Sequence, residues 1–321
     1  MYGNGLKTMK WLQKEDEPKP KLGLVLPGGG ARGAYQVGVL NAIARMQPKN
    51  SPSPFSIITG TSAGSINATA LAINASDFRK GVYRLTRVWK GFHAGHVFRT
   101  DALGIASTGA KWLIGMMLGG IGKYNPHSLL DRAPLRHLLT KTMDFEQIQK
   151  EIDAVHLHAL GITASGYDSG ESVTFYQGEE SIENWDRQRR VGAAEKIDVD
   201  HLMASSAIPL IFSAIKLHRE YFGDGSMRQM APISPALHLG ADKVLIIGVH
   251  KTADDSPKRV RVAGYPPLAQ IAGHVMNSIF VDSLDVDLER LHRINKTIKL
   301  IPPEKLKGEQ SSLKPVESMI I

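Results

Sequence analysis

The stretch that most constrains this chain is Gly60-Thr61-Ser62-Ala63-Gly64, because it stands between a short apolar run and a helix-like run. The run before it, Phe55 to Ile58, predicts a buried strand, and the run after it, Ile66 to Ile73, predicts a helix. A strand that turns abruptly into a helix places the middle residue of the turn on a sharp bend, with its side chain exposed above the sheet. The glycines Gly60 and Gly64 suit such a bend because a Cβ atom there would prevent close approach of strand and helix. The pattern predicts a nucleophilic Ser62 on an elbow, against the alternative of an ordinary glycine-containing loop.

A second strand, loop and helix pattern lies earlier in the chain. Leu22 to Leu26 is an apolar run that predicts a buried parallel strand, and the periodic run Ala34 to Met46 predicts a helix. The loop between them contains G-x-G-x-x-G, which suggests a dinucleotide site. That interpretation needs an acidic residue roughly 20 residues further on, at the end of the second strand, where this chain has Thr59 to Ser62 instead. The other use of such a loop is an oxyanion hole, in which backbone N–H groups stabilise a developing negative charge. The candidate oxyanion-hole residues are Gly28, Gly29, Gly30, Ala31, Arg32, Gly33 and, directly after the serine, Ala63.

The third feature is Asp224, which stands between two glycines, Gly223 and Gly225, after two aromatic residues. Aspartate in such a setting usually accepts local backbone hydrogen bonds, so alone it predicts a turn. Lys243 to Val249 follows as the clearest strand of the chain, and with Leu22 to Leu26 and Ser56 to Thr59 it predicts a parallel central sheet.

Together these segments resemble the patatin-like phospholipase family. Its glycine loop G-G-G-x-[KR]-G is matched by Gly28 to Gly33, its elbow G-x-S-x-G by Gly60 to Gly64, and its aspartate motif D-G-[GA] by Asp224-Gly225. The third motif departs at Ser226, which stands where the family has Gly or Ala. A family-like segment, Ala204 to Pro209, also precedes the aspartate strand, so the resemblance extends over residues 21–249.

The resemblance implies an α/β fold in three α/β/α layers with a mostly parallel sheet, and a serine acyl hydrolase that cleaves carboxylic esters of lipids. The activity would be of the phospholipase A, lysophospholipase or esterase type, without a metal or other cofactor. Ser62 needs a base to take its proton, and Asp224 is the candidate. The reaction would pass through an acyl-enzyme. Arg32 stays protonated and would organise the loop.

Two other functions compete with this interpretation. One is an α/β-hydrolase esterase with a Ser-Asp-His triad, because His250, His274 and His292 follow Asp224 in the required order. Against it, the elbow comes very early, and Arg32 stands in a glycine loop that lipases of that fold begin with histidine. The other is a non-catalytic lipid-binding module on the same fold, favoured by Ser226 and by the basic charge.

Composition bears mainly on partners. A net charge of +8 over 321 residues suits an anionic partner, and with the resemblance it favours peripheral contact with an anionic membrane surface over nucleic acid. The chain has no cysteine, and the histidine pairs His93/His96 and His156/His158 lack further ligands at metal-site spacing, so no metal is expected. No signal peptide or membrane-spanning run is seen, which predicts a cytoplasmic protein; the oligomeric state is not predicted.

For the domain organisation we expect a flexible arm over residues 1–20, a catalytic domain over 21–250, and a C-terminal helical segment and strand over 251–321 packed on the same domain. The apolar region Ala102 to Gly122, whose run Trp112 to Ile121 is bracketed by Lys111 and Lys123, is expected to border the acyl-binding groove. The sequence ends within what looks like a further strand, which predicts either a shortened chain or a partner strand outside it. The other elements predicted are strands at His156 to Thr163 and Ser172 to Gln177, a solvated stretch at Trp185 to Lys196, and helices at Asp200 to Pro209 and Leu268 to Ile294.

Overall fold

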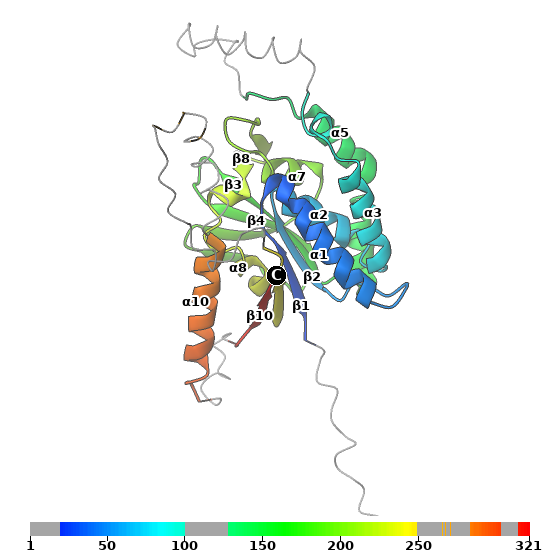
Figure 1. Ribbon diagram of the computed structural model, residues 1–321. Helices are drawn as coiled ribbons and strands as arrows, with labels where there is room; N and C mark the ends of the chain where they lie inside the picture. Colours follow the sequence, from blue (N-terminus) through cyan, green and yellow to red (C-terminus); the bar gives the residue numbers. More distant parts are fainter. Residues whose placement is uncertain are drawn as a thin grey trace, which may run out of the picture.

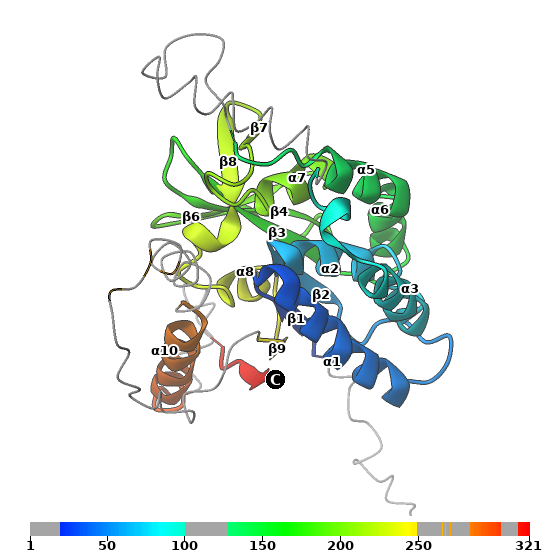
Figure 2. The same ribbon diagram turned by 45° about the horizontal axis from the view of Figure 1, so that its top comes forward.

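The computed structural model describes residues 20–99, 128–248, 283–302 and 314–321, together with 265, 267 and 270. Within these residues a ten-stranded, mostly parallel sheet lies between two layers of helices, as Figure 1 and Figure 2 show. The strands are β1 (Leu22–Leu26), β2 (Ile57–Thr61), β3 (Ala159–Gly166), β4 (Ser172–Gly178), β5 (Trp185–Arg187), β6 (Arg190–Ala194), β7 (Ile215–Leu217), β8 (Glu220–Asp224), β9 (Lys243–Ile246) and β10 (Glu317–Ile320). The helices are α1 (Gly33–Met46), α2 (Ala63–Ala72), α3 (Phe78–Lys90), α5 (Ala133–Thr142), α6 (Glu146–Asp153), α7 (Val199–Ser205), α8 (Ser234–His238) and α10 (Ser283–Ile298), with short 3-10 turns η1 (Gly30–Arg32), η2 (Ala94–His96) and η3 (Gly225–Met227).

Two separate hydrophobic cores account for the three layers. Alternate residues of a strand face opposite sides of a sheet, so Leu24 and Leu26 of β1 join the core under α1, α2 and α3, whereas Val25 joins the core under α8 and α10. In Figure 1 the first group of helices lies on the right of the sheet and α10 on the left. The predicted α/β/α fold class is confirmed.

The predicted central strands are also confirmed, with small shifts in their ends. The order β10-β9-β1-β2-β3 is parallel throughout, and β4 then pairs with β3 in the antiparallel direction as the sequence indicated. The second strand runs on to Thr61, two residues past its predicted end. This extension carries the strand up to Ser62, where the backbone turns away.

The end of the chain pairs inside the molecule. β10 lies parallel to β9, with Glu317 opposite Lys243 and Ile320 opposite Ile246. The predicted terminal strand therefore has a partner, β9, within the same chain. α10 continues to Ile298, beyond the predicted end of the last helix, and the earlier part of that predicted helix lies outside the described residues.

The prediction of a solvated stretch at 185–196 is wrong in part. These residues form β5 and β6 at the edge of the sheet, and Trp185 is buried between the rings of Tyr176 and His238, with ring centroids 5.3 and 4.8 Å away. The charged neighbours masked the strand signal, because an edge strand exposes most of its side chains. The predicted apolar region 102–122, with Lys111 and Lys123, lies outside the described residues.

Candidate active site

Ser62 occupies the bend between β2 and α2. Its φ of 53° and ψ of −127° lie in a region that residues other than glycine rarely adopt, and its side chain is 3% exposed. The bend is possible because its flanking glycines lack side chains. A Cβ atom at Gly60 would lie 2.4 Å from the carbonyl oxygen of Gly64, and one at Gly64 would lie 2.0 Å from that of Leu26. The bend therefore has the backbone geometry expected of an elbow.

Asp224 reaches Ser62 because β8 pairs with β3 just beyond the point where β2 ends. In the register of the sheet, Thr61 is the last residue of β2 and lies opposite Thr163 of β3. The next residue of β3, Ala164, lies opposite Asp224, the last residue of β8. The carboxyl ends of β2 and β8, which run in opposite directions, thus meet beside β3. Asp224 was expected in a turn, but it is a strand residue followed by the turn η3.

The two side chains are in direct contact. Ser62 Oγ donates a hydrogen bond to Asp224 Oδ2 at 2.6 Å, and the backbone N–H of Ser226 donates to Asp224 Oδ1 at 2.9 Å. The Asp224 side chain is fully buried. Burial raises the pKa of Asp224 from 3.8 to about 6, against the opposing effects of the hydrogen bonds from Ser62 and Ser226 and of the positive charge on Arg132. A carboxylate with such a pKa is ionised at neutral pH and is a stronger base than an exposed aspartate.

Arg132 supplies a buried positive charge near this carboxylate. It lies just before α5 and donates to the carbonyl oxygens of Met203 at 2.8 Å and Ser213 at 2.9 Å. Burial lowers the pKa of Arg132 to about 10, and the charge of Asp224 opposes that shift. The guanidinium also lies 5.0 Å from the ring centroid of Phe212. Arg132 remains charged and favours the ionised form of Asp224.

Ser226 fits beside the aspartate although the family motif has a smaller residue there. Its Oγ lies close enough to Asp224 to help restrain the pKa of that carboxyl, but it has no well-formed hydrogen bond within the described part of the chain. A Cβ atom at Gly28 would lie 2.3 Å from Ser226 Oγ and 3.2 Å from Ser62 Cβ. The extra hydroxyl thus occupies space between the glycine loop and the carboxylate.

The glycine loop is held at both ends by buried amides. Gln36 Nε2 donates to the carbonyl oxygen of Pro27 at 2.8 Å, and Asn67 Nδ2 donates to that of Gly33 at 3.1 Å. The two amides bond each other at 2.9 Å, and Trp89 Nε1 donates to Asn67 Oδ1 at 2.8 Å. The loop is consequently fixed relative to α2, which begins at the elbow.

Several of the candidate oxyanion-hole residues lie close to Ser62. Gly30 has a φ of 54° and borders the same groove as Ala31, Ser62 and Ala63. The Arg32 backbone N–H donates to Gly29 at 3.0 Å, but its side chain is exposed. Gly30 and Ala31 thus line the groove together with Ser62, whereas Arg32 is not among its lining residues.

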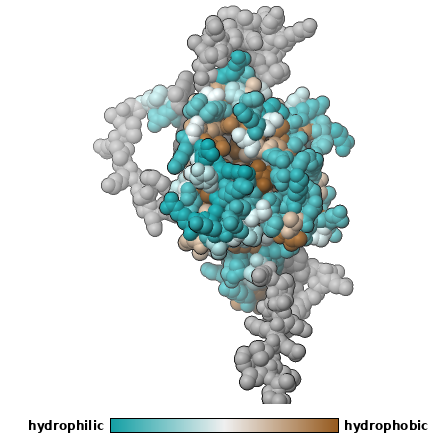
Figure 3. Space-filling view, turned by 90° about the vertical axis from the view of Figure 1, so that its right-hand side faces the viewer, coloured by the Kyte–Doolittle hydropathy of each residue, from teal (hydrophilic) through white to brown (hydrophobic). Residues whose placement is uncertain are grey.

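An apolar groove of about 510 Å³ leads away from Ser62. One stripe of α2 lines it, since Ala63, Ile66, Ala70 and Ile73 are spaced at three and four residues along one helix face. Leucine and aromatic side chains of α3 and α5 form the other walls. Figure 3 shows apolar side chains gathered on this side of the molecule within a polar surround. The groove has the size and lining of a site for an apolar ligand.

The far end of the groove is polar. Asn74 directly follows the last turn of α2, and Arg84 Nη1 of α3 donates to its Oδ1 at 2.7 Å. α2 rises about 1.5 Å per residue, so this pair lies roughly 15–18 Å from Ser62. The pair limits the apolar length of the groove.

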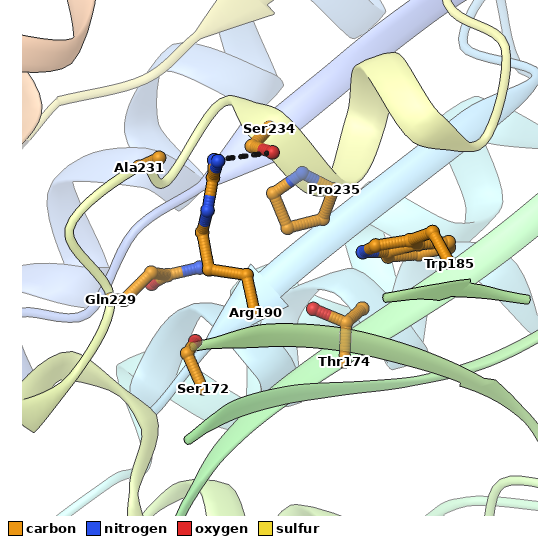
Figure 4. A pocket seen from close by; sticks show the side chains of 8 residues that line it. All are labelled: Ser172, Thr174, Trp185, Arg190, Gln229, Ala231, Ser234 and Pro235. Carbon is orange, nitrogen blue, oxygen red and sulfur yellow. Dashed lines mark hydrogen bonds between the residues drawn. The ribbon is translucent and has the colours of Figure 1, made fainter. Parts of the chain in front are cut away.

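A second cavity lies on the other side of the sheet and is far smaller, about 10 Å³ (Figure 4). Polar side chains of β4 and β6 border it, and Arg190 Nη1 donates to Ser234 Oγ at 3.0 Å. Its volume is about that of one water molecule. It is too small to hold a substrate.

The two histidine pairs noted in the sequence make local contacts. His156 lies 3.0 Å from a carboxylate oxygen of Glu151, His158 lies 2.9 Å from one of Glu179, and His93 stacks on His96. No group of metal-binding side chains occurs among the residues that the structure describes. Within the same residues, no helix combines the length and apolar character needed to cross a bilayer.

Sequence reasoning missed several residues that shape the site. Arg132, Gln36 and Asn67 carry no local motif, since each acts through contacts with residues distant in the chain. Ser205 was included only as part of the family-like segment Ala204 to Pro209, and its hydroxyl accepts a hydrogen bond from the backbone N–H of Ser62 at 2.9 Å. The position of that segment, just ahead of the aspartate strand, was the available signal.

Comparison with known protein families identifies the family of this chain. A family model described as patatin-like phospholipase matches residues 24–237. A search of curated proteins found no match. Among solved structures, VipD from Legionella pneumophila is 12% identical with a TM-score of 0.41, and the match covers 94% of this chain and 61% of that chain. The type III effector protein ExoU is 16% identical with a TM-score of 0.32, and the match covers 72% of this chain and 43% of that chain. This chain thus spans less than two thirds of either protein.

Proposed function

This chain belongs to the patatin-like phospholipase family, and from that premise we propose that it is a serine acyl hydrolase that cleaves ester bonds of lipids with Ser62 and Asp224. The observation that carries the proposal is the hydrogen bond of 2.6 Å from Ser62 Oγ to Asp224 Oδ2 at the mouth of an apolar groove. A nucleophile next to a buried base and an apolar site is what hydrolysis of an acyl ester requires.

In the acylation step, Ser62 Oγ attacks the ester carbonyl carbon while Asp224 takes the hydroxyl proton. The carboxylate is suited to this because its pKa of about 6 leaves it ionised at neutral pH yet closer to the working pH than an exposed aspartate. The tetrahedral intermediate then collapses, the proton passes to the leaving alcohol, and the acyl group stays on Ser62. The second step repeats this with water as the nucleophile, which releases the fatty acid.

The backbone N–H groups of Gly29, Gly30 and Ala63 are proposed to stabilise the oxyanion. Their support is the fixed glycine loop and the start of α2, whose first N–H groups have no partner within the helix. One such donor typically lowers the barrier by about 3–4 kcal/mol. We assign Arg32 to loop organisation, in keeping with its exposed side chain and the bond from its backbone to Gly29.

The groove between α2, α3 and α5 is proposed to hold the acyl chain. Its apolar stripe starts at Ala63, next to the nucleophile, so an acyl chain bound there would place its ester carbonyl at Ser62. The leaving alcohol, with any head group, would lie outside the groove. This arrangement favours substrates with a linear acyl chain, such as phospholipids, lysophospholipids and simple esters.

Peripheral contact with an anionic membrane surface is proposed for the same side of the molecule. Leu210 is 71% exposed with a φ of 66°, two residues from each of the groove-lining residues Ile208 and Phe212. Its carbonyl oxygen accepts from the N–H of Leu129, itself 45% exposed, at 3.0 Å. An apolar residue held exposed in a strained conformation at a site entrance suits insertion into a lipid surface. The net charge of +8 would add attraction to anionic lipids.

The catalytic proposal is tested with a fluorophosphonate probe and a panel of lipid esters. The wild-type protein should be labelled at Ser62 and release fatty acid, and Ser62→Ala should do neither while it stays folded. Product analysis across phospholipid, lysophospholipid and neutral esters then identifies the substrate. A folded wild-type protein that the probe does not label would favour the lipid-binding module instead.

The alternative triad is not favoured by the described contacts of Asp224. Its hydrogen bonds come from Ser62 and Ser226, and His292 lies on α10 with its side chain exposed. His250 and His274 lie outside the described residues. The three histidines are therefore tested by mutation.

A further inference from the structure

The end of α7 contacts both residues of the proposed dyad. Ser205, the last residue of this helix, is fully buried, and its Oγ accepts from the backbone N–H of Ser62 at 2.9 Å. The same Oγ donates to the carbonyl oxygen of Thr163 in β3 at 2.6 Å. Two residues further on, the carbonyl oxygen of Ala207 accepts from the backbone N–H of Asp224 at 2.8 Å. A single short segment thus anchors the backbone of the nucleophile and that of the base.

The anchor at Ser62 is needed because the elbow leaves its N–H outside the sheet. β2 ends at Thr61, and the N–H of the next residue, Ser62, bonds to the Ser205 hydroxyl rather than to a neighbouring strand. A buried backbone N–H without an acceptor is strongly unfavourable. On the other side of the strained residue, Ser65 holds the carbonyl oxygen of Ser62 with its N–H at 2.9 Å and its Oγ at 2.6 Å. Both polar groups of the Ser62 backbone are therefore fixed by serines.

The hydroxyl of Ser205 also ties the elbow to β3, the strand that pairs with β8 and its Asp224. Thr163, which accepts its hydrogen bond, immediately precedes Ala164, the residue paired with Asp224. Movement of Ser62 relative to β3 would therefore strain the bond to Ser205 as well as the contact of 2.6 Å with Asp224. Among the described residues, no other side chain accepts a hydrogen bond from the Ser62 N–H.

We propose that Ser205 is a positioning residue that holds Ser62 at attack distance from its substrate and in contact with Asp224. The inference rests on the proposed function, because it assigns the hydroxyl a role in the rate of Ser62 chemistry. Ser205 itself does not touch the substrate in this scheme. It acts through the backbone of Ser62, and the segment Ala204 to Pro209 thereby gains a specific role.

The test compares Ser205→Ala with wild type in ester hydrolysis and in fluorophosphonate labelling of Ser62. A displacement of about 1 Å at a reacting centre can cost about 100-fold in rate. We therefore expect kcat and the labelling rate constant to fall together, by about 10–100-fold, with KM within about twofold of wild type, because the groove is untouched.

Two further variants separate positioning from folding. Thr59→Val removes a buried hydroxyl of β2 that contacts the carbonyl oxygen of Leu24 at 3.5 Å and does not touch Ser62, so kcat should stay near wild type. Ser205→Cys keeps only a weak hydrogen-bonding group of similar size, so its rates should lie between those of Ser205→Ala and those of wild type. It also serves if the alanine variant does not fold. Thermal unfolding of each variant reports the folded fraction by which the rates are divided.

The outcomes are distinct. A folded Ser205→Ala variant with wild-type kcat and labelling rate per folded molecule would overturn the positioning role, whatever its stability. Equal losses of kcat in Ser205→Ala and Thr59→Val would also overturn the positioning role. Absence of labelling in the wild type would instead overturn the proposed function, before any variant is compared. Should Ser205→Ala not fold, a Ser205→Cys variant with wild-type rates would also refute the positioning role.

Discussion

Because the carboxylate of Asp224 is buried, we predict that Asp224→Asn will both stabilise the protein and inactivate it. Burial raises the pKa of Asp224 from 3.8 to about 6, a difference of about two units (6 minus 3.8). At 1.36 kcal/mol per unit, the ionised carboxylate in the folded protein costs about 3 kcal/mol relative to an unfolded chain. Asp224→Asn removes the charge and keeps an oxygen that can accept from the Ser226 N–H. Since the buried amide has its own desolvation cost, we expect a net gain of about 1–3 kcal/mol in the free energy of unfolding near pH 8.

The direction in which the free energy of unfolding changes with pH shows whether the buried charge of Asp224 is responsible. A folded-state pKa above the unfolded-state value means that the folded protein binds more protons between about pH 4 and pH 6, so the wild type loses stability as pH rises through that window. The asparagine variant lacks this loss. Its advantage should be small near pH 4, grow up to about pH 6 and stay constant above about pH 7.

Thermal unfolding of both proteins at a series of pH values measures this difference. For a large domain, 1 kcal/mol shifts Tm by about 2–4 °C, so the variant should unfold a few degrees higher near pH 8. Its kcat/KM should fall by about 10²–10⁴-fold, because the amide cannot take the proton of Ser62. Asp168→Asn, at an exposed position, serves as the control and should change neither quantity. A variant that is less stable than wild type by the same amount at every pH would refute the argument from buried charge.

Four further predictions concern the groove, the surface and the base. The kcat/KM of the wild type should fall as pH drops through about 6, because protonated Asp224 cannot act as a base; a rate that is flat down to about pH 4 would exclude it from that role. Ala70→Trp should fill the middle of the groove, reduce kcat/KM for esters of about twelve carbons or more by at least about tenfold, and spare butyrate esters; an unchanged chain-length profile would place the acyl chain elsewhere. Leu210→Asp should weaken binding to anionic vesicles and hydrolysis of vesicle lipids without affecting a soluble ester, whereas equal losses on both substrates would point to damage at the site rather than to membrane contact. His292→Ala should keep wild-type activity, as should the equivalent changes of His250 and His274, and a loss as large as that of Ser62→Ala in any folded variant would establish the triad instead.

The parts of the fold that the sequence predicted are those with a strong local signal. The apolar runs of β1 and β9 and the turn between β3 and β4 are read from neighbouring residues, and the structure confirms them. The edge strand β5 and its neighbour β6 were missed, because their mostly exposed side chains leave too few apolar residues to give a pattern. Register and strand order have no comparable local signal, since they depend on which distant segments pack together.

For the site, the sequence by itself determined which chemical groups are available and the local backbone that presents them. Glycines at fixed spacing around Ser62 permit a strand to turn into a helix, and the same is true of the glycine loop; both follow from sterics within a few residues. Only the tertiary structure decided that Asp224, 162 residues beyond Ser62, fills the place beside β3 where β2 ends. It also decided that Arg132 and Ser205, which carry no motif, lie next to the dyad. The physical reason is that a pKa, a hydrogen bond across the sheet and a groove between helices depend on burial and on contacts between segments, and these exist only once the sheet has formed.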